Sequence, residues 1–156
     1  MNIFLPTKLR RGFTLIELLV VIGILTVLLA IVLVAINPAR QFSQANDTQR
    51  RSDVNAILNA IHQYAADNKG TLPTDIATTS KVISSTATSA LCGNLVPKYV
   101  ADIPIDPTAG TESPAGSVCT DTGATYNSGY SVIKNADNRI TVSATGEITT
   151  SISVTR

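Results

Sequence analysis

The sequence predicts an α+β protein in which one long N-terminal helix packs against a C-terminal antiparallel β-meander. Three observations predict this fold class. The stretch from Phe13 to Ile36 is apolar at 20 of its 24 positions, residues 37–70 repeat apolar side chains every three or four positions, and residues 130–156 contain three short runs of alternating apolar residues.

The apolar stretch is long enough to cross a membrane. As a helix, 24 residues reach about 36 Å, against a hydrocarbon core of about 30 Å. The preceding leader carries Lys8, Arg10 and Arg11 and no acidic residue, which favours the cytoplasmic side for the N-terminus. A cleavable secretory signal has a shorter apolar region, of about 7–15 residues. The length of the segment therefore predicts a membrane helix that stays attached to the protein.

Glu17 separates two interpretations of this helix. A plain single-pass anchor explains the length and the basic leader, but a carboxylate within the apolar run costs about 2.5–3.5 kcal/mol on insertion scales. A plain anchor therefore does not explain Glu17. We therefore expect a partner for this carboxylate.

A family resemblance supplies that partner. The run Arg10-Arg11-Gly12-Phe13-Thr14-Leu15-Ile16-Glu17-Leu18 resembles the processing signal of type IV pilins and type II secretion pseudopilins. The resemblance implies that prepilin peptidase cuts between Gly12 and Phe13 and methylates the new amine of Phe13. It also implies that Glu17 meets the N-terminal amine of a neighbouring subunit during assembly, and that the fold is the type IV pilin fold.

The amphipathic half of the helix follows directly. Val54, Ile57, Leu58, Ile61 and Ala65 form one apolar stripe, which requires a covering sheet. We expect a bend near Asn37-Pro38 and a stop at Gly70 and Pro73. The expected organisation is a removed leader at 1–12, a transmembrane or filament-core helix at 13–36, an amphipathic half at 37–70, a variable loop region at 71–129, and the β-meander at 130–156.

The head contains a second, looser resemblance. The string Tyr99 to Pro107, followed by Tyr126 and Tyr130, is similar to the Y..IP.DP and later Tyr pattern of many pilin and pseudopilin heads. The segment Asn94–Ala101 predicts a short helix or turn within an otherwise loop-like region. Ser and Thr occupy 27 of the 86 positions from Thr71 onward, which favours an exported surface.

The two cysteines, Cys92 and Cys119, predict a disulfide in the exported head, because no metal-type spacing competes with it. Two free buried thiols are the alternative. A mutual bond would tie the long Ser/Thr-rich loop to the sheet and stabilise the head by roughly 3–4 kcal/mol in the chain-entropy model.

Other candidate sites have simpler interpretations. Four aspartates could ligate calcium, but they form no compact calcium loop and fit turn chemistry instead. His62 reads as a residue at the helix rim. Arg50 and Arg51 could contact DNA phosphates, yet beside two aspartates they favour helix-surface ion pairs or subunit contacts. We expect Tyr64 and the three later tyrosines to pack within the head. The four aspartates are Asp102, Asp106, Asp121 and Asp137.

These observations predict a structural filament subunit with no catalytic residue, metal or cofactor. The expected partners are prepilin peptidase, further copies of this chain and other pilins, and an inner-membrane assembly platform. We expect a single-pass inner-membrane protein that later enters an extracellular pilus or a periplasmic pseudopilus. Without the leader, nine Lys+Arg face eleven Asp+Glu, which does not argue for a polyanion; DNA stays open as a partner without support.

Two alternatives remain open. A type II secretion pseudopilin shares the N-terminal signal and differs in what its filament does. A monomeric membrane-anchored binding module belongs to another class, and in it Glu17 would be incidental. An enzyme is the least favoured interpretation, because the sequence contains no recognisable nucleophile, metal or phosphate motif.

Overall fold

The structure is a computed structural model that describes residues 12–116, 119, 123 and 125–156. The chain divides into two compact units, Met1–Gln41 and Phe42–Arg156, and each is described by itself. The predicted leader residues Lys8, Arg10 and Arg11 and the candidate ligand Asp121 lie outside the described residues.

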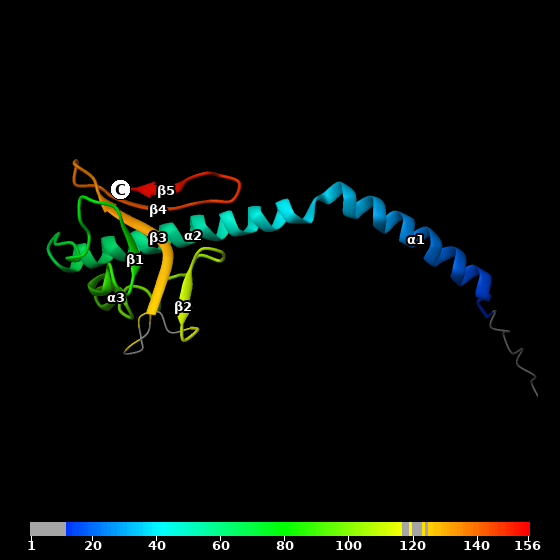
Figure 1. Cartoon of the computed structure of the whole chain (residues 1–156), viewed down its shortest axis with the longest axis horizontal. Helices are drawn as coiled ribbons and strands as arrows, with labels where there is room; N and C mark the ends of the chain where they lie inside the picture. Colours follow the sequence, from blue (N-terminus) through cyan, green and yellow to red (C-terminus); the bar gives the residue numbers. More distant parts are fainter. Residues whose placement is uncertain (1–11, 117–118, 120–122, 124) are drawn as a thin grey trace, which may run out of the picture. The chain divides into compact units, whose positions relative to one another are not determined.

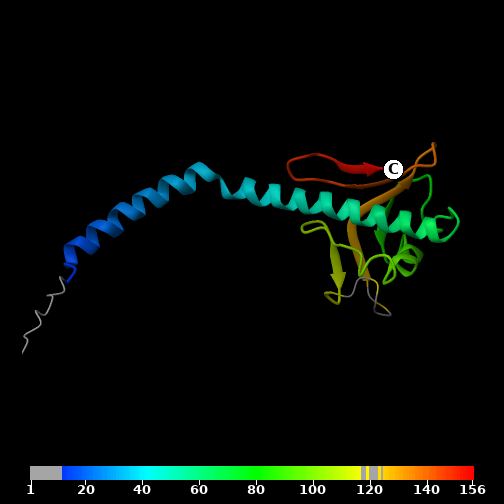
Figure 2. The same cartoon turned by 180° about the vertical axis from the view of Figure 1, so that it is seen from behind.

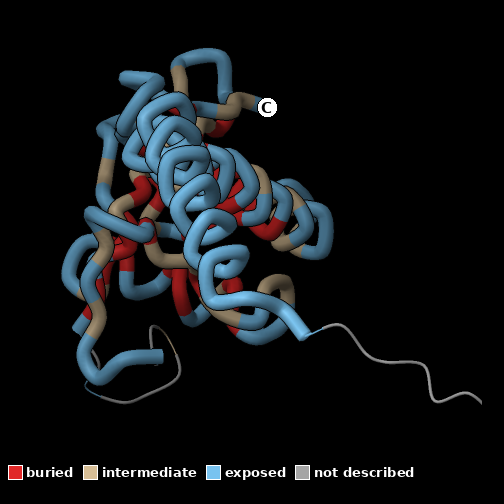
Figure 3. Tube along the Cα trace, turned by 90° about the vertical axis from the view of Figure 1, so that its right-hand side faces the viewer, coloured by how far each residue is buried: buried red, intermediate tan, exposed pale blue. Residues whose placement is uncertain are grey.

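The first unit contains the apolar helix α1, Leu15–Ile36. None of its residues is buried, as the pale blue helical tube in Figure 3 shows. The helix ends at Asn37, whose left-handed φ of 47° stops the helical hydrogen-bond ladder. Helix α2, Pro38–Asp67, starts at the next residue, and proline is favoured at a first helical position. The helix is therefore interrupted at Asn37, at the place where we expect a bend.

In the second unit, α2 lies along one face of an antiparallel sheet (Figures 1 and 2). The strand order is β1-β3-β4-β5, and β2 pairs with the other end of β3. A short helix, α3, connects β1 to the region before β2. The fold is α+β with an apolar N-terminal helix, as predicted and as in the pilin fold. The bounds are β1 Lys81–Ser84, α3 Ser89–Leu95, β2 Thr111–Ser113, β3 Thr125–Lys134, β4 Ile140–Ala144 and β5 Ile152–Thr155.

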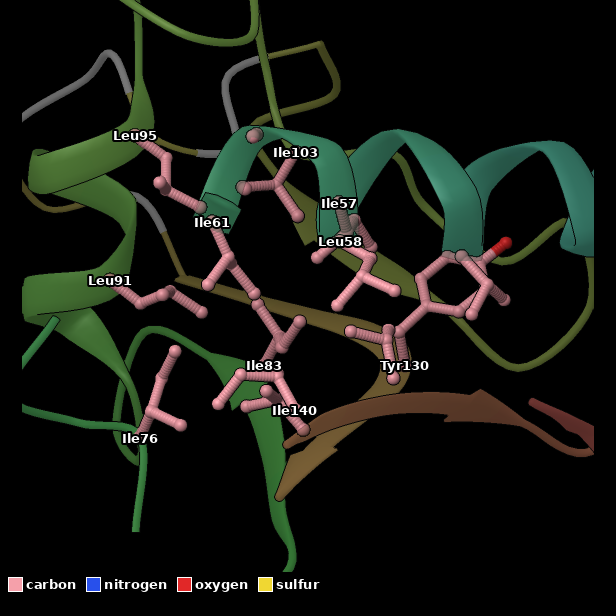
Figure 4. Packing of buried hydrophobic residues seen from close by; sticks show 14 of the residues in the cluster. Ile57, Leu58, Ile61, Ile76, Ile83, Leu91, Leu95, Ile103, Tyr130 and Ile140 are labelled. Atoms are coloured by element: carbon pink, nitrogen blue, oxygen red, sulfur yellow. The ribbon is translucent and has the colours of Figure 1, made fainter. Parts of the chain in front are cut away.

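The core forms where the α2 stripe meets the sheet. Ile57, Leu58 and Ile61 are fully buried and face side chains from the strands and from α3 (Figure 4). Val54 continues this row and is also fully buried. Burial of each large aliphatic side chain contributes about 1.5–3 kcal/mol, so the stripe holds the head on its helix. The predicted stripe is confirmed through Ile61, and Ala65 at its end is half-buried.

Some elements differ from the expectation. β3 begins at Thr125, five residues before the predicted meander. The sequence does not predict this early start, because Ser128 is polar although buried and so interrupts the apolar alternation of the strand. Ile148 is apolar and falls within the predicted meander, but it lies exposed in the loop before β5. α3 starts at Ser89, earlier than the predicted Asn94–Ala101 segment. β1 and β2 fall in the region expected to be loop, because strands of four and three residues leave little periodicity.

Cys92 and Cys119 form a disulfide, with their Cα atoms 5.7 Å apart. Cys92 lies on α3 and is buried. The predicted bond is therefore present, and it joins α3 to the segment that precedes β3.

Candidate functional site

The first candidate site is the start of α1, where two side chains cap each other. The backbone N–H and the hydroxyl of Thr14 both donate to Glu17 Oε2 at 2.8 Å. The backbone N–H of Glu17 in turn donates to Thr14 Oγ1 at 3.3 Å. This reciprocal arrangement is a capping box, which satisfies orphan donors at the N-terminus of a helix. Glu17 therefore has a partner within its own chain.

The rest of α1 presents apolar side chains around its whole circumference. It is 22 residues long, long enough and apolar enough to cross a membrane. Large apolar residues on it stay about half exposed or more, for example Leu25 at 57% and Leu33 at 56%. A helix that is apolar all round requires lipid or other helices as its surroundings.

The second candidate site is a buried charge cluster in the head, centred on Arg50 of α2. Arg50 is only 1% exposed. Its Nε and Nη2 atoms donate to the two carboxylate oxygens of Asp106 at 2.7 and 3.0 Å. Its Nη1 atom donates to Asp47 at 2.8 Å and to Glu147 at 3.2 Å. We call these four residues the Arg50 cluster.

Two carboxylates of the cluster, those of Asp47 and Asp106, also organise a loop each. Asp47 Oδ1 accepts the backbone N–H of Glu147 at 2.8 Å, and Asp47 Oδ2 accepts those of Ile148 and Thr149 at 3.0 Å. Three successive N–H groups pointing at one anion form a nest. Asp106 accepts the backbone N–H groups of Thr108 and Ala109 at 2.9 and 2.8 Å. The cluster therefore fastens two loops to α2.

Glycines make room for these carboxylates. A Cβ atom at Gly146 would collide with the carbonyl oxygen of Thr149 and lie 3.0 Å from the Asp47 carboxylate. Gly129 has a φ of 79°, and a Cβ there would lie 2.6 Å from the Cβ of Asp106. Both loops can approach α2 only because these two side chains are absent.

The environment keeps the cluster charged. Burial acts to raise the pKa of Asp106, but the hydrogen bonds from Arg50 and from the Ala109 and Thr108 amides outweigh burial and lower the pKa to about 2. The amides of Thr149 and Glu147 lower the pKa of Asp47. The hydrogen bond to Asp106 raises the pKa of Arg50. All three groups are ionised at neutral pH.

A third buried contact lies beside the cluster on α2. The hydroxyl of Tyr130 donates to Asp53 Oδ2 at 2.7 Å, and both residues are buried. Burial, followed by the Asp53 hydrogen bond, raises the pKa of Tyr130. The phenol therefore stays protonated and keeps donating.

Comparison with known proteins finds a family match for one part of the chain. Residues 7–33 match the family model described as the prokaryotic N-terminal methylation motif. The chain carries the signature of type IV pilins and pseudopilins. No curated protein and no solved structure matches the chain. The methylation motif covers the leader junction, the Thr14–Glu17 capping box and most of α1.

The methylation motif marks a pilin-type family of structural, generally non-enzymatic proteins, and α1 suggests a membrane anchor before assembly. Gly12 and Phe13 lie exposed just before α1 in the structure. The capping box was not part of our sequence prediction. Its signal was present, however, because Thr14-Leu15-Ile16-Glu17 has the Thr-x-x-Glu spacing of such a box.

The sequence interpretation of Arg50 as a helix-surface residue is wrong, because its side chain is buried in the Arg50 cluster. Arg51 is exposed and donates to Thr149 Oγ1 at 3.2 Å. A signal for the burial existed. Asp47 and Arg50 precede Val54 by seven and four residues, so they lie on the same helical face as the apolar stripe.

The other predicted candidates separate in the structure. Asp106 belongs to the Arg50 cluster, Asp102 accepts the N–H of Ile103 at 2.8 Å, and Asp137 lies in the β3–β4 turn. Among the described residues, no group of three or more His, Cys, Asp or Glu side chains could hold a metal ion. His62 is half-buried on α2, which agrees with a rim position.

The Y..IP.DP segment acquires a structural role at both ends. Asp106 binds Arg50, while the Tyr99 hydroxyl donates to Asp67 at 2.9 Å near the C-terminal end of α2. The Tyr99 ring also meets Tyr64 edge-on, with centroids 5.8 Å apart. The segment is therefore attached to α2 at two places.

Proposed function

We propose that the chain is a structural subunit of a type IV pilus-like filament. Prepilin peptidase would cut it between Gly12 and Phe13 and methylate Phe13, and assembly would proceed from the inner membrane through α1. The observation that carries the proposal is the match of residues 7–33 to the methylation motif, together with a 22-residue apolar helix of which no residue is buried.

The physical driving force is an exchange of contacts. Before assembly, the apolar surface of α1 lies in lipid; in a filament, the same surface packs against copies of α1. Such contacts use different faces of each copy, and this kind of interface extends into a fibre instead of closing into a ring. The finer role, in adhesion, motility or DNA uptake, is part of the proposal.

Glu17 would take its assembly role by exchanging partners. In the single chain its carboxylate binds Thr14. Cleavage after Gly12 creates a free amine at Phe13, a stronger partner because it is charged. We propose that the amine of a neighbouring subunit takes over the Glu17 carboxylate as subunits join.

A secretion pseudopilin is the alternative within this class, since the same motif marks both kinds of protein. Intact mass and N-terminal sequencing of the protein from its native membrane test the processing step. We expect a start at Phe13 with one added methyl group. A start at Met1, or cleavage near Ala35, would contradict it.

Substitution Glu17→Ala tests assembly against the anchored-module alternative. We expect loss of filaments with the protein retained in the membrane. Thr26→Ala is a matched control, because the Thr26 hydroxyl donates to the Gly23 carbonyl oxygen of its own helix at 2.8 Å and carries no charge. Unchanged surface display of Glu17→Ala, equal to that of the control, would favour a monomeric module.

A further inference from the structure

A polar groove lies between α2 and the loop that connects β4 to β5 (Figure 1). Its volume is about 360 Å³, within the range of about 300–1,000 Å³ that is typical of small-molecule sites. We call it the α2 groove. It is lined by Gln44, Asp47, Thr48, Arg51, Ile148 and Thr149.

The two walls of the α2 groove are held in place by the head itself. The four lining residues of α2 are spaced three, four and three positions apart, so they share one face of the helix. The opposite wall consists of Ile148 and Thr149, whose backbone N–H groups both donate to Asp47 at 3.0 Å. The nest around Asp47 therefore shapes the groove in advance, and a pre-formed site loses less conformational freedom when a ligand binds.

Arg51 supplies the free charge of the groove. A guanidinium group has five N–H donors, and Arg51 Nη2 donates one of them to Thr149 Oγ1 at 3.2 Å. This hydrogen bond orients the side chain toward the loop wall. The ion pairs of the described residues involve Arg50 or Lys98, and none involves Arg51. Arg51 can therefore bind an anionic ligand without giving up an ion pair.

Asp47 also lines the groove, but its carboxylate is already occupied. Oδ1 accepts N–H groups from Arg50 and Glu147, and Oδ2 accepts those of Ile148 and Thr149. Each oxygen therefore accepts two hydrogen bonds, and Arg50 compensates the charge. A ligand in the groove meets the donors of Arg51 and no free acceptor on Asp47.

The remaining lining groups are uncharged. Within the described residues the Gln44 side chain makes no hydrogen bond, so its amide can both donate and accept. Thr48 Oγ1 donates to the Gln44 carbonyl oxygen at 2.8 Å and keeps its acceptor capacity. The Thr149 hydroxyl accepts from Arg51 and keeps its proton. The exposed side chain of Ile148 adds an apolar surface beside these groups.

We propose that the α2 groove binds a small hydroxylated carboxylate of monosaccharide size. The carboxylate pairs with the Arg51 guanidinium through two parallel hydrogen bonds, the geometry that arginine and carboxylates favour. Ligand hydroxyls bond Gln44 and Thr48, and ligand C–H groups contact Ile148. The inference concerns the head of one subunit and does not depend on filament assembly.

The test uses the full chain in detergent micelles, titrated in a calorimeter with sodium D-glucuronate. Methyl β-D-glucoside is the uncharged probe of similar size. We expect D-glucuronate to bind about tenfold or more tightly than the uncharged sugar, because hydrogen bonds between ionised groups are about twice as strong as neutral ones. In NMR spectra of the isotope-labelled chain, D-glucuronate should shift the backbone amides of Ile148 and Thr149.

Three variants locate the binding. Arg51→Gln removes the guanidinium and should weaken D-glucuronate binding about tenfold or more. Arg51→Lys keeps the charge but lacks the planar fork, so we expect an intermediate loss of affinity. Arg139→Gln is the matched control, because it removes an arginine that lies just before β4 and outside the groove lining, and it should bind like the unmodified chain. Thermal unfolding by circular dichroism checks that all three variants fold.

Four results would overturn the inference. One is no binding of D-glucuronate to the unmodified chain. Another is equal weakening by Arg51→Gln and Arg139→Gln, which would indicate a net-charge effect. A third is equal affinity for D-glucuronate and methyl β-D-glucoside, which would show that the carboxylate is not recognised. The last is self-association of the chain that Arg51→Gln abolishes, without D-glucuronate binding, which would assign the groove to a contact between copies.

Discussion

Arg50 donates two hydrogen bonds to the carboxylate of Asp106, although 56 residues separate them in the sequence. This paired geometry is the strongest form of an arginine–carboxylate contact. It joins the middle of α2 to the loop of the Y..IP.DP segment. A buried pair of this kind contributes little net stability when intact, but removing one partner leaves an uncompensated charge.

Substitution Arg50→Ala should destabilise the head strongly. It leaves Asp106 and Asp47 buried without their cation, which costs about 3–5 kcal/mol. Urea unfolding of the full chain in detergent, followed by circular dichroism, measures the loss. Arg51→Ala is the neighbouring control, because Arg51 is exposed, and it should cost about 0.5 kcal/mol or less. Equal losses of unfolding free energy in Arg50→Ala and Arg51→Ala would contradict the central position of Arg50 in the cluster.

The head should lose stability in acid. The folded-state pKa of Asp106 is about 2 against an ordinary value of 3.8, so between these values the unfolded chain binds more protons than the folded one. Stability therefore rises with pH through this window, is complete above about pH 4, and is lost as the pH falls toward 2. Melting temperatures measured at pH 5, 4, 3 and 2.5 test this.

The Asp106→Asn variant provides the control for the acid effect. It lacks the titrating carboxylate, so its melting temperature should start lower and depend less steeply on pH in the same window. If the melting temperature of Asp106→Asn falls in acid as steeply as that of the unmodified chain, other carboxylates account for the acid effect.

Removing the Tyr130 hydroxyl should destabilise the head, because it leaves the buried Asp53 carboxylate without this donor. We expect Tyr130→Phe to cost about 1–3 kcal/mol in urea unfolding. Tyr126→Phe is a matched control on the same strand. The Tyr126 hydroxyl is buried and has no hydrogen-bond partner among the described residues, so its removal should be neutral or stabilising. A larger loss of unfolding free energy in Tyr126→Phe than in Tyr130→Phe would contradict this assignment.

A methyl group at Gly146 should disrupt the nest around Asp47. Its Cβ would collide with the Thr149 carbonyl oxygen and press on the Asp47 carboxylate. We expect Gly146→Ala to lower the melting temperature and to increase amide hydrogen exchange at residues 147–149. Gly93→Ala on α3 meets no atom within 4 Å and should stabilise its helix by up to about 1 kcal/mol. Unchanged exchange in Gly146→Ala would argue against the nest.

Much of the fold follows from local signals. The apolar run predicts α1, the three-and-four spacing of Val54 to Ile61 predicts the buried face of α2, and Asn37-Pro38 predicts the break between the helices. β1 and β2 escaped prediction because strands of four and three residues are too short to show a period. The early start of β3 escaped because Ser128 is buried and polar, which hides the alternation of that strand.

The sequence by itself determined the N-terminal helix of this protein, because the methylation motif and the apolar run both consist of residues adjacent in the chain. Only the tertiary structure decided the electrostatics of the head. Net charge and local spacing are averages along the chain, whereas the field at a side chain depends on its neighbours in space. Helix packing therefore buried Arg50 among three carboxylates, of which Asp106 and Glu147 lie far from it in the sequence.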